Sequence, residues 1–98
     1  MQISFERSGG FAGVTLRADV DVDALSAADA KRVTKMIQDA DFFDLPKRLT
    51  AASPQPDRFQ YKITITDKGK QKTVTTDDQT APESLKPLIR YLNQQAHA

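Results

Sequence analysis

The sequence predicts a small α+β domain, ordered ββαββα, in which two helices cover one face of a four-stranded antiparallel sheet. Two observations predict this fold class. Two pairs of segments alternate apolar and polar residues, and a short run of turn-forming residues separates the members of each pair. Each pair is followed by a segment whose apolar residues recur at helical spacing. Placing both helices on the same side of one sheet buries all of these apolar positions.

The first pair of strands surrounds a glycine-rich segment. In residues 2–7, Ile3 and Phe5 share one face, and the alternation resumes in residues 14–18. Residues 8–13 lie between them, and their glycines supply the positive backbone dihedral angles of a tight turn. The sequence therefore predicts a hairpin over residues 2–18.

The first helix is expected to begin at Ser26, three residues before Asp29 as in a capping box, and to end near residues 39–41. Its apolar positions are Ala30, Val33, Ile37 and Ala40. An apolar stretch, residues 42–46, follows and is expected to pack in the core. The polar connection over residues 47–57 contains Pro54 and Pro56 and is expected to be the most mobile part of the chain.

The second pair of strands is the more regular. Residues 59–65 alternate strictly, and Gly69 lies in the turn that joins them to the threonine-rich residues 71–76. Because residues 71–76 contain few apolar side chains, we expect them at an edge of the sheet. The last helix is expected to begin at Ser84, since Pro87 is tolerated in the first turn. Its apolar stripe comprises Leu85, Leu88, Ile89 and Leu92.

Composition limits the partners and the location of the protein. The 98 residues suffice for one domain, residues 1–98, and the net charge of +1 gives no general reason to expect nucleic acid. No apolar run approaches the roughly 18 residues that a membrane span requires. The absence of cysteine, together with an N-terminus that lacks the apolar stretch of a signal peptide, predicts a cytoplasmic protein. We expect it to be monomeric when free.

The residue types that most catalysis needs are scarce. The single histidine, His97, lies next to the C-terminus, where chains usually fray. Asp19, Asp21 and Asp23 alternate as on a solvated strand end, and an EF-hand counted from Asp19 would have alanine where its glycine and glutamate are needed. No zinc-peptidase, P-loop or dinucleotide-binding motif occurs. The sequence therefore predicts no catalytic residue, no metal ligand and no cofactor, and hence a protein that is not an enzyme.

The lysines at the tip of the second hairpin allow two interpretations, a nucleic-acid contact or a solubilising strand edge. Lys68, Lys70 and Lys72 are not accompanied by aromatic residues that could stack on bases. The solubilising edge is therefore favoured.

The glycine-rich segment is the best candidate for a contact with another protein. It carries Phe11 among small residues, and an exposed aromatic on a tight turn is typical of a binding loop. The alternative is that Phe11 folds back onto the core. The first candidate set comprises Ser8, Gly9, Gly10, Phe11, Ala12 and Gly13. The second candidate set, from the proline-containing connection, comprises Ser53, Pro54, Pro56 and Asp57.

The order of several short motifs resembles that of a known family. The motifs are Phe5-x-x-Ser8-Gly9-Gly10-Phe11-Ala12-Gly13, Phe42-Phe43-x-Leu45-Pro46, Asp57-x-Phe59-x-Tyr61 and Ala81-Pro82 before a leucine-rich helix. Together they resemble the emfourin family, small bacterial protein inhibitors of thermolysin-like zinc metallopeptidases such as protealysin.

The resemblance implies a single inhibitor domain that binds such a peptidase tightly and blocks its active-site cleft. It implies no cofactor of the inhibitor's own. Phe11 would then fill the pocket that accepts the bulky apolar side chain after the scissile bond. The alternative function is a non-inhibitory interaction module that binds another protein through a sheet edge, at residues 71–76.

Overall fold

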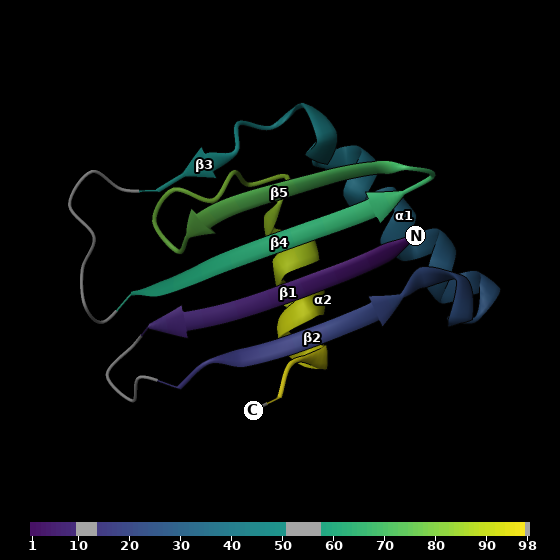
Figure 1. The fold of residues 1–98 in the computed structure, drawn as a ribbon, viewed down its shortest axis with the longest axis horizontal. Coiled ribbons are helices and arrows are strands. Elements are labelled where there is room, and N and C mark those ends of the chain that lie inside the picture. The colour runs from purple at the N-terminus through teal and green to yellow at the C-terminus, as the bar shows by residue number, and fades with distance from the viewer. Residues whose placement is uncertain (10–13, 51–57, 98) are drawn as a thin grey trace.

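The computed structural model describes residues 1–9, 14–50 and 58–97, which form one sheet and two α-helices (Figure 1). The sheet has the order β2-β1-β4-β5-β3. Its strands are β1 (Gln2–Gly9), β2 (Leu16–Asp21), β3 (Arg48–Leu49), β4 (Phe59–Asp67) and β5 (Lys70–Asp77). The helices are α1 (Ala27–Asp39) and α2 (Lys86–Gln95), and short 3₁₀ turns lie at η1 (Val22–Ala24) and η2 (Phe42–Asp44).

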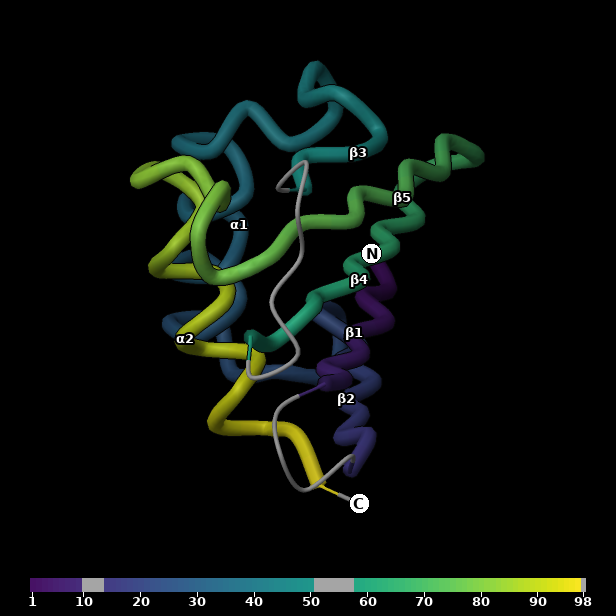
Figure 2. Tube along the Cα trace, turned by 90° about the vertical axis from the view of Figure 1, so that its left-hand side faces the viewer, coloured from purple at the N-terminus to yellow at the C-terminus, as the bar shows by residue number. Residues whose placement is uncertain are grey.

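Both helices lie on the same side of the sheet, so the molecule has two layers (Figure 2). The strand residues that face the helices are apolar, whereas the other face of the sheet is polar. The core fills the space between the layers and includes Ile3, Phe5, Ala18, Val20, Val33, Ile37, Phe42, Tyr61, Ile63, Ile65, Val74, Leu85, Leu88, Ile89, Tyr91 and Leu92. The predicted α+β class and the placement of both helices on one face are confirmed.

The prediction of four antiparallel strands is wrong in detail, because the sheet has five strands and is mixed. The extra strand, β3, runs parallel to the last strand, with Arg48 opposite Thr75 and Leu49 opposite Thr76. The Thr75 N–H donates to the carbonyl of Lys47 at 2.9 Å, which fixes β3 beside β5. Two residues are too few to show an alternating pattern, so this strand could not be recognised in the sequence. Part of the connection expected to be mobile is therefore strand.

The second strand begins later than predicted. It spans Leu16–Asp21, and Val14, expected in the core, is 48% exposed. Leu16, opposite Arg7, is the first residue of β2 in the ladder with β1, so Val14 lies outside that ladder. Asp19 and Asp21 are exposed residues of β2, as predicted for a solvated strand end, and Asp23 lies in the turn η1 that follows.

The helices begin close to the predicted positions. Ser26 is the N-cap of α1, and its hydroxyl accepts a hydrogen bond from the Asp29 N–H at 3.2 Å. α2 begins at Lys86, two residues later than the predicted start at Ser84, and Pro87 lies in its first turn. Neither α-helix in the described part of the chain is long and apolar enough to cross a membrane.

The C-terminal histidine is not frayed, contrary to expectation. The His97 N–H donates to the carbonyl of Arg17 at 2.9 Å, and the Arg17 N–H donates back to the carbonyl of His97 at 3.0 Å. These two bonds cover part of the outer edge of β2. His97 therefore has a structural role at a sheet edge through its backbone.

Candidate functional site

The described residues that are next in sequence to the two candidate sets lie at the same end of the sheet. Gly9, the last residue of β1, lies opposite Phe59, the first residue of β4. Residues 10–13 directly follow Gly9, and residues 51–57 directly precede Arg58 (Figure 1). Ser8 and Gly9 lie in the described part of the chain; the other candidates, Gly10, Phe11, Ala12, Gly13, Ser53, Pro54, Pro56 and Asp57, lie outside the described residues.

Gly9 holds the backbones of β1 and β4 unusually close together. Its φ is +94°, a conformation that residues with a side chain rarely adopt. A Cβ atom at this position would lie 2.5 Å from the carbonyl oxygen of Arg58. The predicted need for glycine is thereby confirmed at Gly9, where it has two physical causes.

Ser8 lies on the polar face of the sheet, away from the helices. It is exposed and lies opposite Gln60. It borders a shallow hollow of about 230 Å³, lined also by Glu6, Gln60, Tyr61, Lys62 and Thr75. Ser8 is therefore accessible to a partner that approaches this end of the sheet.

Arg7 links the end of β1 to β4 and to α2. Its guanidinium carbon lies 4.4 Å from the centroid of the Phe59 ring, within the range of a cation–π contact. The same guanidinium donates a hydrogen bond from Nη1 to Oδ1 of Asn93 at 3.1 Å. The ring of Phe59 therefore lies beneath a cation that is itself held by the last helix.

Asp78 fixes the first residues of β4. Its Oδ2 accepts a hydrogen bond from the Phe59 N–H at 3.1 Å, and its own N–H donates to the Phe59 carbonyl at 3.3 Å. The Tyr61 hydroxyl donates to Oδ1 of the same carboxylate. Burial, together with the bond to and the negative charge of Asp78, raises the pKa of Tyr61 to about 12. The phenol therefore stays protonated at neutral pH and keeps its partner.

A compact turn, residues 77–80, begins at the last residue of β5. Asp77 is buried, and its Oδ1 accepts hydrogen bonds from the Gln79 N–H at 2.9 Å and the Thr80 N–H at 2.8 Å. The Thr80 hydroxyl contacts both Asp77 Oδ1 and the carbonyl of Leu49. Since a hydroxyl has one proton, that proton is shared between the two acceptors.

Turn 77–80 was not predicted as part of the site. An aspartate followed three residues later by threonine is the signal for such a side-chain-capped turn. Its tie to Leu49, however, joins residues 31 positions apart and depends on the pairing of β3 with β5. Local sequence patterns do not reveal such a contact.

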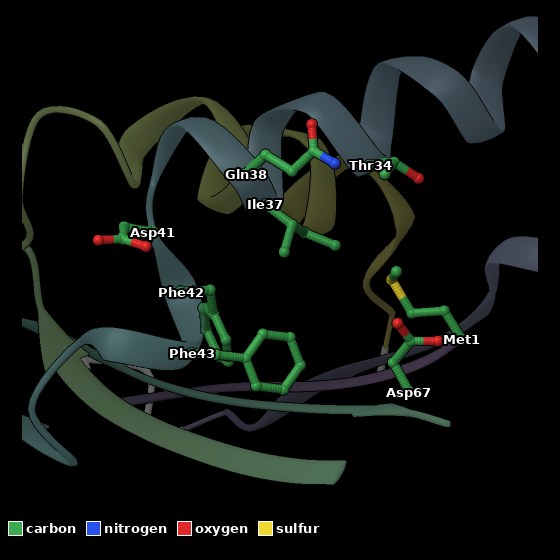
Figure 3. A pocket seen from close by; sticks show the side chains of 8 residues that line it. All are labelled: Met1, Thr34, Ile37, Gln38, Asp41, Phe42, Phe43 and Asp67. Atoms are coloured by element: carbon green, nitrogen blue, oxygen red, sulfur yellow. The ribbon is translucent and has the colours of Figure 1, made fainter. Parts of the chain in front are cut away.

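A second hollow, of about 330 Å³, lies at the opposite end of the sheet, where the N-terminus meets α1 (Figure 3). It is lined by Met1, Thr34, Ile37, Gln38, Asp41, Phe42, Phe43 and Asp67. The Phe43 ring packs edge-on against Phe42, with the ring centroids 5.9 Å apart. The expectation that the apolar stretch 42–46 packs in the core holds for Phe42, which is 1% exposed. It is wrong for Pro46, which is exposed, and does not hold fully for Phe43, which is 36% exposed.

Two acidic residues, Asp41 and Asp67, line the second hollow. A hydrogen bond to Asp44, together with its negative charge, raises the pKa of Asp41 above its usual value. The terminal amine of Met1 lies 3.1 Å from Oδ2 of Asp23. None of the residues of either candidate set lines this hollow in the described part of the chain. In residues 1–9, 14–50 and 58–97, no group of three or more His, Cys, Asp or Glu side chains is placed to hold a metal ion.

Comparison with known proteins places the chain in a family. The family model Emfourin matches residues 5–93, nearly the whole length, including most of β1, all of β4, turn 77–80 and most of α2. No curated protein and no solved structure matches the chain. The chain belongs to the Emfourin family.

Proposed function

We propose that residues 1–98 act as a single inhibitor domain that binds a bacterial thermolysin-like zinc metallopeptidase of the protealysin type and blocks its active-site cleft. Membership of an inhibitor family supports a peptidase partner. The observation that carries the proposal is the pairing of Gly9 with Phe59, because Gly9 belongs to the first candidate set and the second candidate set ends at Asp57, two residues before Phe59 in the sequence. A protein that occludes a cleft needs such a localised contact surface.

The affinity would come from a contact surface whose supports are already ordered before binding. The Gly9–Arg58 approach and the hydrogen bonds of Asp78 fix the strand ends from which both candidate sets continue. Little entropy is then lost at these supports on binding, and a few buried side chains provide most of the stabilisation. Phe11 is the proposed anchor, in the pocket for the bulky apolar residue after the scissile bond. In this proposal the inhibitor contributes no metal ion and no catalytic residue. A cytoplasmic location would allow it to protect the cell from its own peptidase.

Titration of a purified thermolysin-like peptidase tests the proposal. Hydrolysis of a short peptide substrate is followed while the inhibitor is added. We expect activity to fall linearly to an endpoint near one inhibitor per enzyme, with no recovery when excess zinc is added. Recovery with zinc would indicate metal removal, and full activity at micromolar excess of the inhibitor would contradict the proposal for that enzyme.

The alternative function, an interaction module that binds through a sheet edge, is supported by one observation. In the described residues, β3 pairs only with Thr75 and Thr76, so β5 has no neighbouring strand on its outer side over residues 70–74. A panel of unrelated proteases separates the two functions. The inhibitor acts on thermolysin-like members alone, whereas the module inhibits none.

A further inference from the structure

We propose that residues 77–80 form a positioning turn, in which Thr80 and Asp78 hold the ends of β3 and β4 at the separation that inhibition requires. This inference rests on the proposed inhibitory function. Neither residue belongs to the predicted contact surface. They act through Leu49 and Phe59, which lie on either side of the connection between β3 and β4.

Thr80 holds the end of β3. The carbonyl of Leu49 accepts hydrogen bonds from two hydroxyls, that of Thr80 and that of Thr76, the latter at 2.8 Å. β3 has just two residues in its ladder with β5, so these side-chain bonds are a large part of what fixes it. Removing the Thr80 hydroxyl would leave Leu49 with a weaker attachment to the turn.

Asp78 holds the start of β4 from the same turn. Its carboxylate and its N–H both bond to the backbone of Phe59, which forms a closed pair of hydrogen bonds. The Tyr61 hydroxyl occupies the second carboxylate oxygen and orients it. Leu49 and Phe59, which flank the connection, are thus attached to Thr80 and Asp78, two residues of the same turn.

The turn itself is tied to the core. Asp77 is 2% exposed and accepts three hydrogen bonds from within the turn, from the Gln79 N–H, the Thr80 N–H and the Thr80 hydroxyl. The Ala81 N–H donates to the Asp77 carbonyl at 3.1 Å, and Leu85 beyond it is completely buried. Movement of the turn would therefore disturb packed residues, which makes it a rigid support.

Phe59 also connects the turn to β1. Its ring lies beneath the Arg7 guanidinium, and Arg7 precedes Ser8 and Gly9 of the first candidate set. A displacement of Phe59 would also shift the end of β1, because Gly9 packs closely against the carbonyl of Arg58, the residue before Phe59. Both strand ends at this edge of the molecule thus depend on one turn.

Three variants test the positioning role. Thr80→Val removes the hydroxyl and keeps the shape, Thr80→Ser keeps the hydroxyl, and Thr64→Val is the matched control. Thr64 shares a hydrogen bond with the Thr73 hydroxyl at 2.9 Å on the polar face, so the control loses a hydroxyl bond elsewhere in the sheet. We expect Thr80→Val to raise the inhibition constant about tenfold, the effect of one hydrogen bond of ordinary net strength. Thr80→Ser and Thr64→Val should stay within about twofold of the unmodified protein.

Limited digestion with trypsin gives a readout that does not depend on the metallopeptidase. Trypsin cleaves after arginine and lysine, and the bonds to follow are those after Arg48 and Arg58, which directly precede Leu49 and Phe59. We expect Thr80→Val to accelerate cleavage at these two sites several-fold, relative to cleavage after Arg17 or Arg32, because local opening exposes them. Thr64→Val should leave the ratio unchanged.

The outcomes separate the two proposals. Weaker inhibition and faster cleavage with Thr80→Val alone support the positioning turn. Unchanged inhibition with Thr80→Val, or equal weakening with Thr64→Val, overturns it. If the unmodified protein does not inhibit, the proposed function fails, and the cleavage ratio then decides whether the turn holds Leu49 and Phe59 in place.

Discussion

Gly9 is the residue at which the backbone geometry of the contact end is most tightly constrained. Its positive φ would strain the backbone of any residue that has a side chain. In addition, a Cβ atom at this position would clash with the carbonyl oxygen of Arg58. Gly69 in the β4–β5 turn shares the first constraint, with φ of +82°, but an added Cβ would meet nothing within 4 Å. A comparison of Gly69 with Gly9 therefore distinguishes the cost of a positive φ alone from the added cost of a steric clash.

Replacement of each glycine by alanine should destabilise the fold to different degrees. Gly69→Ala is expected to lower the free energy of unfolding by about 1 kcal/mol, the cost of a left-handed alanine. Gly9→Ala is expected to lower it by about 3 kcal/mol, because β1 and β4 must also separate. Urea unfolding followed by circular dichroism measures both values. Equal losses would show that the Gly9–Arg58 approach relaxes at no cost.

Among the elements, long strands and helices could be predicted from the sequence, whereas short elements and side-chain ties could not. β4 alternates over nine residues and α2 carries a continuous apolar stripe, so local pattern and tertiary burial agree. β3 has two residues and depends on its neighbour β5. In the site, the need for glycine at position 9 could be predicted from the neighbouring sequence. The hydrogen bonds of Asp78 and Thr80 to Phe59 and Leu49 could not, because they depend on how the strands pair.

The two phenylalanines of η2 are adjacent in sequence but differ in environment. Phe42 is 1% exposed, whereas Phe43 is 36% exposed beside the hollow between α1 and the sheet. Phe42→Ala should lower the free energy of unfolding by about 4 kcal/mol through loss of burial and creation of a cavity. Phe43→Ala should lower it by about 1 kcal/mol. Comparable losses in urea unfolding would mean that Phe43 packs more fully than its exposure indicates.

On the scale of the whole molecule, the core and the proposed contact surface are separate. The core lies between the helices and the sheet, whereas Ser8 and Gly9, the described residues of the proposed contact surface, lie at one end of the sheet. The hollow beside Phe43 lies at the other end (Figure 3). Stability and inhibition should therefore respond to different substitutions.

Phe11→Ala tests this separation. If Phe11 anchors the complex, the substitution should weaken binding to the peptidase by about 2 kcal/mol or more, the scale of an aromatic hot spot, while the thermal midpoint stays nearly unchanged. Phe42→Ala is the converse control, since it should lower the midpoint and leave the inhibition constant of the folded protein within about twofold. Inhibition constants are measured well below the midpoint of each variant. A large fall in midpoint with intact inhibition would instead identify Phe11 as a core residue and move the anchor to the second candidate set.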